Sequence, residues 1–418
     1  MHPKPHHKWV IFFFASLLFV LSQFYRATIA VITPQLIDDL ALSTRQVSLM
    51  SAAFFYAFAA MQIPLAVYLD TLGAKKVMIV LNSVAIAGVI TFAAAPSSRM
   101  LIAGRVLLGI GMACNLMGTL KLIATWFSPR RFATLAAVVF SMGTAGNIMA
   151  TTPLVYLVEW IGWRFSFLLV GVLNFILIMV FVRVVDDTPE PPSPQEAPRK
   201  GLSKTLAGIT ELLSIKDYWI ISLGSFCRYG IFAAIQGLYA GPYLMFVMDL
   251  KPVTVGNIIL SMNIGIICGG PLFGWISDRL IHSRKWVIIP GLTGFGTMVW
   301  VLATLSPGAG IVSLAALFFM VGFFSSSGGI MYPHIKERMP PEKSGMAMTG
   351  INFFTMIGPA VFLQGLGVVM QTLHSENAWS ADAFQHAFLI CGSCLMGVAL
   401  LYVFTSGKRS LSWERYND

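Results

Sequence analysis

Four basic side chains lie inside long apolar stretches of the sequence: Arg26, Arg105, Lys121 and Arg228. A cation that faced hydrocarbon at the middle of a bilayer would cost about 2.5 to 3.5 kcal/mol, so we expect these four to face the protein interior or to reach an interface. All 18 Asp and Glu residues fall in predicted loops or at the ends of apolar stretches. The pattern therefore predicts a central cavity with uncompensated positive charge, which a bound anion would neutralise.

Hydrogen-bonding side chains share a helical face with two of these arginines. They are Ser22, Gln23 and Thr33 beside Arg26, and Gln236, Tyr239 and Tyr243 beside Arg228. Aromatic bulk and hydrogen-bonding groups suit an organic anion, and the planar guanidinium can bind a carboxylate or a phosphate through two parallel hydrogen bonds. We predict that Arg26 and Arg228 bind the anion. The alternative is that each arginine packs between helices and donates to main-chain carbonyls.

Arg105 and Lys121 are predicted to assist, but on one continuous helix they could not easily line the same pocket. They are sixteen residues apart in the sequence, which is about 160° around an α-helix. Lys121 could instead reach the cytoplasmic surface with its flexible side chain, and Arg105 could be a structural or gating residue. Asn352 is a further candidate cavity donor, for which an interhelical hydrogen bond is an equally good explanation.

Two charged loops in the two halves of the chain share a pattern. Asp70 and Asp278 are 208 positions apart, and so are Pro34 and Pro242. Two landmarks with one spacing indicate a duplicated unit, with the same helix, charged loop and helix in each half. The predicted gating residues of these loops are Asp70, Gly73, Lys75, Lys76, Gly274, Asp278 and Arg279.

These loops resemble the signature loop of the major facilitator superfamily, which runs Gly, three residues, Asp, Arg, then Gly and basic residues. The second copy keeps Gly274, Asp278 and Arg279, whereas the first has Ala66 in place of the glycine and Thr71 in place of the arginine. The resemblance implies an all-α membrane protein of twelve transmembrane helices in two pseudo-symmetric six-helix bundles. The bundles would rock around a site at the membrane midplane, and the two loops would hold their cytoplasmic ends together in the outward-facing state.

A narrower resemblance rests on few residues. Tyr25-Arg26, with Pro34 eight positions later, resembles the first helix of the organophosphate:phosphate exchangers and the anion:cation symporters. An arginine at this place in those families contacts the anionic group of the substrate. Arg228-Tyr229-Gly230-Ile231 is similar to helix 7 of the exchangers. Arg228 precedes Pro242 by fourteen residues rather than eight, so the two arginines are not equivalent under the repeat.

Composition excludes a water-soluble domain, because 56% of the residues are hydrophobic and 11% are charged. Twelve apolar stretches reach the roughly 20 residues that a spanning helix needs. Most Lys and Arg residues fall in alternate loops, which places both termini in the cytoplasm by the positive-inside rule. The net charge of +10 is therefore a topology signal and does not indicate nucleic acid. We expect a multi-pass protein of the cell membrane, which would be the inner membrane in a bacterium.

The predicted domains follow the duplication. Residues 1–185 form the first bundle, residues 186–215 a polar, proline-rich cytoplasmic linker, residues 216–405 the second bundle, and residues 406–418 a cytoplasmic tail. Cys391 and Cys394 form a C-x-x-C spacing, but they lie inside an apolar helix without histidine companions, so we read them as packing residues.

The sequence thus favours a secondary active transporter of a small organic anion, most simply a carboxylate. Proton symport and anion exchange, including exchange of phosphorylated solutes, remain open as coupling modes. The rival functions are a drug or metabolite exporter, which usually has buried acids for cationic cargo, and a transporter-like sensor. We expect no enzyme activity, cofactor or metal, because no nucleophile and base, ligand cluster or nucleotide loop is found. The expected partners are the anion, a coupling proton and the lipid bilayer, and the expected state is a monomer.

Overall fold

The structure is a computed structural model that describes residues 7–186, 214–305, 307–339, 341–374 and 377–405. Within these ranges the regular structure is helical, with no strand. The helices of the amino-terminal half are α1 (His7–Ala27), α2 (Ile29–Leu40), α3 (Thr44–Leu72), α4 (Ala74–Ala93), α5 (Ser98–Met112), α6 (Asn115–Trp126), α7 (Pro129–Met149) and α8 (Thr152–Val184).

The helices of the carboxyl-terminal half include several short segments of different winding. They are α10 (Lys216–Ala234), η1 (Ile235–Tyr239), α11 (Ala240–Pro242), η2 (Tyr243–Val247), α12 (Pro252–Trp275), η3 (Ile276–Leu280), α13 (Lys285–Thr304), α14 (Ile311–Ser325), η4 (Ser326–Ile330), α15 (Met331–Arg338), α16 (Pro341–Leu373) and α17 (Ala381–Tyr402). The segments η1, η2 and η3 are π-helical turns, and η4 is a 3₁₀ turn.

The sequence explains where several helices begin. Ser43 and Gln46 form a capping box at the start of α3, with the Ser43 backbone nitrogen 2.9 Å from Gln46 Oε1. The Ser380 hydroxyl accepts a hydrogen bond from the Ala383 backbone at the start of α17. Pro129 opens α7, a position where its missing N–H has no cost.

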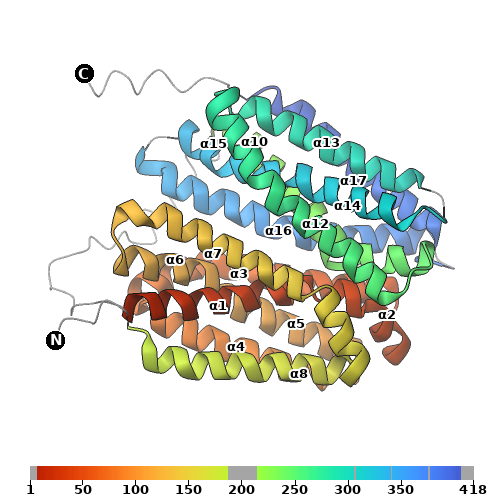
Figure 1. The fold of residues 1–418 in the computed structure, drawn as a ribbon, viewed down its shortest axis with the longest axis horizontal. Coiled ribbons are helices and arrows are strands. Elements are labelled where there is room, and N and C mark those ends of the chain that lie inside the picture. Colours follow the sequence, from red (N-terminus) through yellow and green to blue (C-terminus); the bar gives the residue numbers. More distant parts are fainter. Residues whose placement is uncertain (1–6, 187–213, 306, 340, 375–376, 406–418) are drawn as a thin grey trace. The chain divides into compact units, whose positions relative to one another are not determined.

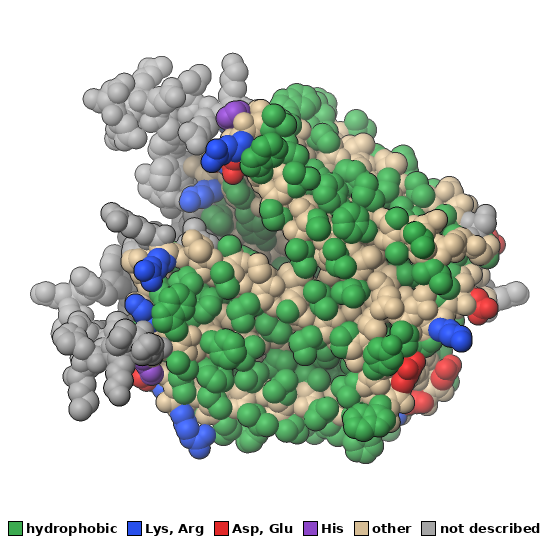
Figure 2. Space-filling view, viewed as in Figure 1, with side chains coloured by type: hydrophobic (Ala, Val, Ile, Leu, Met, Phe, Trp, Pro, Cys, Tyr) green, Lys and Arg blue, Asp and Glu red, His purple; other side chains and the backbone are tan. Residues whose placement is uncertain are grey.

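Ten helices of the described residues are long and apolar enough to cross a membrane, and Thr134–Met149 of α7 is a shorter apolar helix. Large apolar side chains are exposed along them, including Trp160 at 82% and Val312 at 83%. Figure 2 shows hydrophobic side chains covering the flanks of the helices on its visible face, with charged side chains near helix ends. A surface of this kind suits a lipid environment.

The chain forms two compact units. The first comprises Met1–Arg199, Gly237–Pro242 and Lys251–Gly256, and the second comprises Lys200–Gln236, Tyr243–Leu250 and Asn257–Asp418. In the first unit α4 packs along α5 and α8, α3 packs on α5, and α1 packs on α7 (Figure 1). In the second unit α10 packs on α16 and α13 packs on α17. The predicted tail, and the predicted linker apart from residues 186, 214 and 215, lie outside the described residues.

Two predicted helices are interrupted. The first is broken at Thr28, between α1 and α2, and the fourth at Ala113 and Cys114, between α5 and α6. Ala113 has φ −63° and ψ −29°, and Cys114 has φ −82° and ψ −20°, so both keep right-handed helical angles. The separation of about 160° between Arg105 and Lys121 therefore stays a prediction. Gly162 has φ 76° and bends α8, in a left-handed conformation that glycine adopts without steric cost.

Candidate functional site

Arg228 lies in the second unit, within a group of polar side chains from three helices. The hydroxyl of Tyr332 donates to Asn352 Oδ1 over 3.1 Å and to Thr355 Oγ1 over 3.2 Å. The Thr355 and Ser225 hydroxyl oxygens are 2.6 Å apart, and Ser225 precedes Arg228 by three residues on α10. Arg228 is half-buried, and its Nε is enclosed without a hydrogen-bond partner among the described residues. The group combines one cation with neutral donors and acceptors.

In the second unit, the carboxylates that the structure describes in ion pairs are bound by arginines other than Arg228. Arg284 pairs with Asp278 and Glu337, and Arg338 pairs with Asp217. Arg228 forms no ion pair within the described part of the chain. Its positive charge is therefore available to an anion from outside the protein.

Gln236 and Tyr243, which the sequence places near the face of Arg228, have partners of their own. Gln236 donates from its amide nitrogen to Asn263 Oδ1 over 2.8 Å, and the Tyr243 hydroxyl donates to the Leu302 carbonyl over 3.2 Å. The predicted residue Tyr239 lies in η1 with 1% of its surface exposed. Two of the three described π-helical turns, η1 and η2, lie in the segment that follows α10, and such turns often occur at functional sites.

In the first unit, Arg105 is 1% exposed and donates from Nη1 to the backbone carbonyl of Tyr25 over 2.8 Å. The guanidinium carbon lies 4.6 Å from the centre of the Phe54 ring, as in a cation–π contact. The Thr28 hydroxyl also donates to the Tyr25 carbonyl. Two side-chain donors therefore bind this carbonyl three residues before the break in the helix.

Arg26 and Tyr25 are both buried in the first unit. The guanidinium of Arg26, which is 8% exposed, lies over the Phe58 ring at 4.3 Å from its centre. Tyr25 is fully buried beside Phe167, and its hydroxyl has no hydrogen-bond partner among the described residues. Aromatic rings therefore contact both Arg26 and Arg105.

Lys121 is partly exposed on α6, and its ammonium donates to the backbone carbonyl of Leu69 on α3. Leu69 immediately precedes Asp70, so Lys121 contacts the end of α3 that leads into the signature loop. Lys121, which the sequence predicts to assist anion binding, therefore contacts the residue next to Asp70, a predicted gating residue.

The signature loop of the second unit contains an ion-pair network centred on Arg284. Its guanidinium contacts the Asp278 carboxylate, lies 3.0 Å from Glu337 Oε1 and donates to the Ser277 hydroxyl over 3.0 Å. Partial burial disfavours the charge of Arg284, but the hydrogen bonds and charges of Glu337 and Asp278 outweigh it and raise the pKa of the guanidinium. The predicted residue Arg279 is exposed, and Gly274 has open space where a Cβ would lie.

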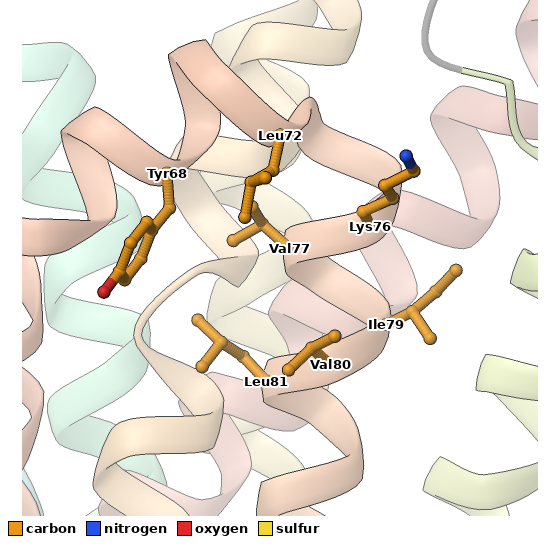
Figure 3. Close-up of a pocket in the computed structure, with 7 residues that line it drawn as sticks. All are labelled: Tyr68, Leu72, Lys76, Val77, Ile79, Val80 and Leu81. Atoms are coloured by element: carbon orange, nitrogen blue, oxygen red, sulfur yellow. The ribbon is translucent and has the colours of Figure 1, made fainter.

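The loop of the first unit is tighter. Gly73 joins α3 to α4 with φ 84°, and Lys75 lies 3.2 Å from Asp186 Oδ1. Asp70 lies in the last turn of α3, and its side chain is outside the described part of the structure. Lys76 is exposed and borders a surface hollow between α3 and α4 (Figure 3). The other residues that line this hollow are Tyr68, Leu72, Val77, Ile79, Val80 and Leu81. None of the predicted anion-binding residues lines it.

Two all-helical units with apolar flanks and buried cations define a polytopic membrane protein of the class that carries solutes. The sequence profile described as Major Facilitator Superfamily matches residues 13–363 and 221–412, and the chain belongs to this superfamily. It is a transport protein and not an enzyme. The predicted membership of the superfamily is confirmed.

Curated relatives are similar over most of the chain. The "Probable galactarate/D-glucarate transporter GarP" of Escherichia coli (strain K12) is 23% identical over 97% of this chain and 96% of its own length. The "Probable sulfoacetate transporter SauU" of Cupriavidus necator is 24% identical over 83% of this chain and 84% of its own length. The "Hexuronate transporter" of Escherichia coli (strain K12) is 27% identical over 70% of this chain and 74% of its own length.

Solved structures show the same fold. A bacterial homologue of the human lysosomal transporter Spinster aligns with a TM-score of 0.76 at 16% identity, over 96% of this chain and 97% of its own. A mutant of the nucleoside transporter NupG aligns with a TM-score of 0.76 at 14% identity, over 94% of this chain and all of its own.

Sequence reasoning did not identify Tyr332, Thr355 and Ser225, which lie in the polar group with Asn352. Each is a common residue of membrane helices, and interhelical hydrogen bonds explain such residues in general. The signal that could have found two of them is the spacing of Asn352 and Thr355 along α16 and of Ser225 and Arg228 along α10, since residues three apart share a helical face.

Proposed function

We propose that this chain is a secondary transporter that moves a small organic anion, a carboxylate, across a membrane by alternating access. The observation that carries the proposal is the environment of Arg228. Its half-buried guanidinium lies against Gly328, four residues before Tyr332, whose hydroxyl binds Asn352 and Thr355. The carboxylates described in ion pairs in this unit are engaged with Arg284 and Arg338. A substrate carboxylate would supply the missing negative charge and accept two parallel hydrogen bonds from the guanidinium.

The names of the relatives support an anionic substrate. Galactarate and D-glucarate are dicarboxylates, hexuronate is a monocarboxylate, and sulfoacetate carries a sulfonate and a carboxylate. All of them bear at least one carboxylate, and relatives named for them align with 70% to 97% of this chain. We infer that the carboxylate is the common group that Arg228 recognises.

The remaining predicted residues have proposed supporting roles. Arg26 is proposed as a second cation for the substrate, assisted by Arg105 or Lys121. Polar groups for the rest of the substrate are proposed to come from Tyr25, Gln236, Tyr239 and Asn352. The signature loops are proposed to hold the outward-facing state through Asp70, Gly73, Lys75, Lys76, Gly274, Asp278 and Arg279, and the Arg284 network supports such a role in the second unit.

The proposed topology has twelve spans, both termini in the cytoplasm and a monomer in the cell membrane. The proposed bundles are residues 1–185 and 216–405, the proposed linker is residues 186–215, and the proposed tail is residues 406–418. Attaching a fluorescent reporter to either end tests the orientation, and fluorescence only outside the cytoplasm would overturn it.

Proton symport is the proposed coupling mode. In proteoliposomes, an inward proton gradient should then increase the initial rate of anion uptake, and a protonophore should remove the increase. Uptake that does not depend on the proton gradient, but requires an anion loaded inside the proteoliposomes, would instead indicate exchange.

Uptake into proteoliposomes tests the substrate class. We expect saturable uptake of at least one labelled carboxylate from a panel of galactarate, glucuronate and sulfoacetate, and none of the neutral sugar galactose. Arg26→Ala and Arg228→Ala should both impair uptake, whereas Arg183→Ala should not. Arg183 is the matched control because it is an exposed arginine that donates to its own helix at the Met179 carbonyl. Undiminished uptake in both test variants would overturn the role of the arginines.

A further inference from the structure

The helical segment that faces Arg228 changes its winding between α14 and α15. Residues Ser326–Ile330 form the 3₁₀ turn η4, with the sequence Ser-Ser-Gly-Gly-Ile. The hydroxyls of Ser326 and Ser327 donate to the carbonyls of Phe323 and Phe324 over 2.6 and 2.8 Å. A 3₁₀ turn inside a longer helix often marks a functional hinge, and small residues with hydroxyls that bond backwards favour one here.

The two glycines of this turn differ in what surrounds them. A Cβ added at Gly328 would collide with Nε and Cζ of Arg228 and would lie 2.8 Å from its Cδ. A Cβ added at Gly329 would meet nothing within 4 Å. Neither residue has an unusual backbone angle, since the positive-φ glycines of the described residues are Gly73, Gly162 and Gly308. The need for glycine at position 328 is therefore one of space for the guanidinium.

Tyr332 lies one helical turn after Gly328. It follows Gly328 by four residues, which places both on one face of the helix. Its hydroxyl binds Asn352 and Thr355 on α16, and Thr355 contacts the Ser225 hydroxyl on α10. This chain of hydrogen bonds connects α15, α16 and α10, and so fixes the distance between the Gly328 backbone and the helix that carries Arg228.

We infer that Gly328 is a positioning residue for substrate binding: its missing side chain lets the Arg228 guanidinium lie against the η4 backbone, in the orientation that receives the anion. This inference rests on the proposed role of Arg228 in binding a carboxylate. A Cβ at position 328 would displace the guanidinium, and a misplacement of about 1 Å can cost up to about 100-fold in function. The adjacent Gly329 carries no such requirement.

The test compares Gly328→Ala with Gly329→Ala, which make the same chemical change in neighbouring residues of one turn. Any effect of alanine on helix propensity is shared, so the difference between the variants reports the contact with Arg228. In proteoliposomes, Gly328→Ala should raise the anion concentration for half-maximal uptake by about tenfold or more and change the maximal rate little. Gly329→Ala should stay near the wild type in both quantities. Equal behaviour of the two variants would overturn the inference.

Thermal unfolding in detergent gives a second readout that does not require transport. Gly328→Ala should lower the Tm in the wild-type background because the added methyl is overpacked, and this loss should disappear in an Arg228→Ala background, where the colliding atoms are absent. A loss of the same size in both backgrounds would show that Gly328 does not contact Arg228. If Arg228→Ala leaves uptake unchanged, the proposed function fails, while this stability comparison still decides where the guanidinium lies.

Discussion

The arginines of the two units differ in their partners. In the second unit Arg338 is paired with a carboxylate in an interior position, with side-chain exposures of 16% for Arg338 and 11% for Asp217, whereas Arg228 has no carboxylate partner among the described residues. In the first unit Arg105 is bound to a main-chain carbonyl, and the ion pair between Arg164 and Asp39 lies at the surface. A carboxylate or a carbonyl fixes an arginine in place. We propose that Arg228, which has no such partner among the described residues, binds the ligand.

Replacement of Arg228 should give the largest functional effect. Arg228→Ala removes the charge and the planar fork, and we expect kcat/KM for anion uptake to fall about 100-fold, as when a buried charged contact is truncated. Arg228→Lys keeps the charge but cannot form two parallel hydrogen bonds, so its activity should be intermediate. Initial uptake rates at several anion concentrations measure this. Lysine activity equal to that of the wild type would show that the charge alone matters.

Removal of the interior ion pair should have the largest effect on stability. Arg338→Ala leaves Asp217 without the guanidinium that lies 2.8 Å from it, and we expect a loss of about 2 kcal/mol, below the range for a fully buried pair because some solvent reaches both side chains. Arg164→Ala is the control at the exposed pair, where the loss should be less than about 1 kcal/mol. Thermal unfolding in detergent compares the two. A larger loss for Arg164→Ala would reverse the comparison between the units.

Arg105 should be structural in a way that Arg228 is not. In Arg105→Ala the buried carbonyl of Tyr25 loses one of its two side-chain donors, which we expect to cost about 1 kcal/mol. Arg105→Lys keeps a cationic donor on a side chain of nearly the same length and should recover part of the loss. The measurement is the Tm of both variants and of Arg228→Ala under one condition. A smaller fall in Tm for Arg105→Ala than for Arg228→Ala would contradict the assignment.

The sequence predicted the architecture because it depends on patterns that local residues carry. Apolar stretches predict membrane helices, and the common spacing of Asp70 with Asp278 and of Pro34 with Pro242 predicts the duplication. The breaks at Thr28 and at Ala113 were not predicted, since no proline or glycine stands at either. Backbone carbonyls near the two breaks accept hydrogen bonds from side chains that are distant in the sequence. Arg105 donates to the Tyr25 carbonyl, and Gln62 donates to the Ala113 carbonyl. Such donors are visible only after the helices have packed.

The same limit applies to the candidate site. Depth in an apolar stretch indicates that Arg228 needs a partner, but it does not reveal which groups surround the side chain. The requirement for glycine at position 328 and not at 329 depends on the approach of another helix. In the sequence the two glycines are equivalent members of a Ser-Ser-Gly-Gly run.

The smallest predicted effect concerns the exposed ion pair of the first unit and its dependence on pH. Hydrogen bonds from the Trp163 indole and from Arg164, each 2.8 Å long, hold the pKa of Asp39 below its ordinary value, together with the charge of Arg164. A lowered pKa in the folded state means that the ionised carboxylate stabilises the fold above the ordinary pKa of aspartate. This contribution is lost as the pH falls through the lowered value.

Asp39→Asn should therefore lower the free energy of unfolding at neutral pH by less than about 1 kcal/mol, because both side chains are partly solvated. The Tm should fall slightly. The difference between Asp39→Asn and the wild type should shrink as the pH is lowered towards and below the ordinary aspartate pKa of 3.8. Tm measurements across this range, with Asp38→Asn as the neighbouring control, test the prediction. A difference that grows towards acid pH would mean that Asp39 is not stabilised as a carboxylate. The exposed pair of Arg164 and Asp39 could then not be compared with the interior pair of Arg338 and Asp217 as a weaker ion pair.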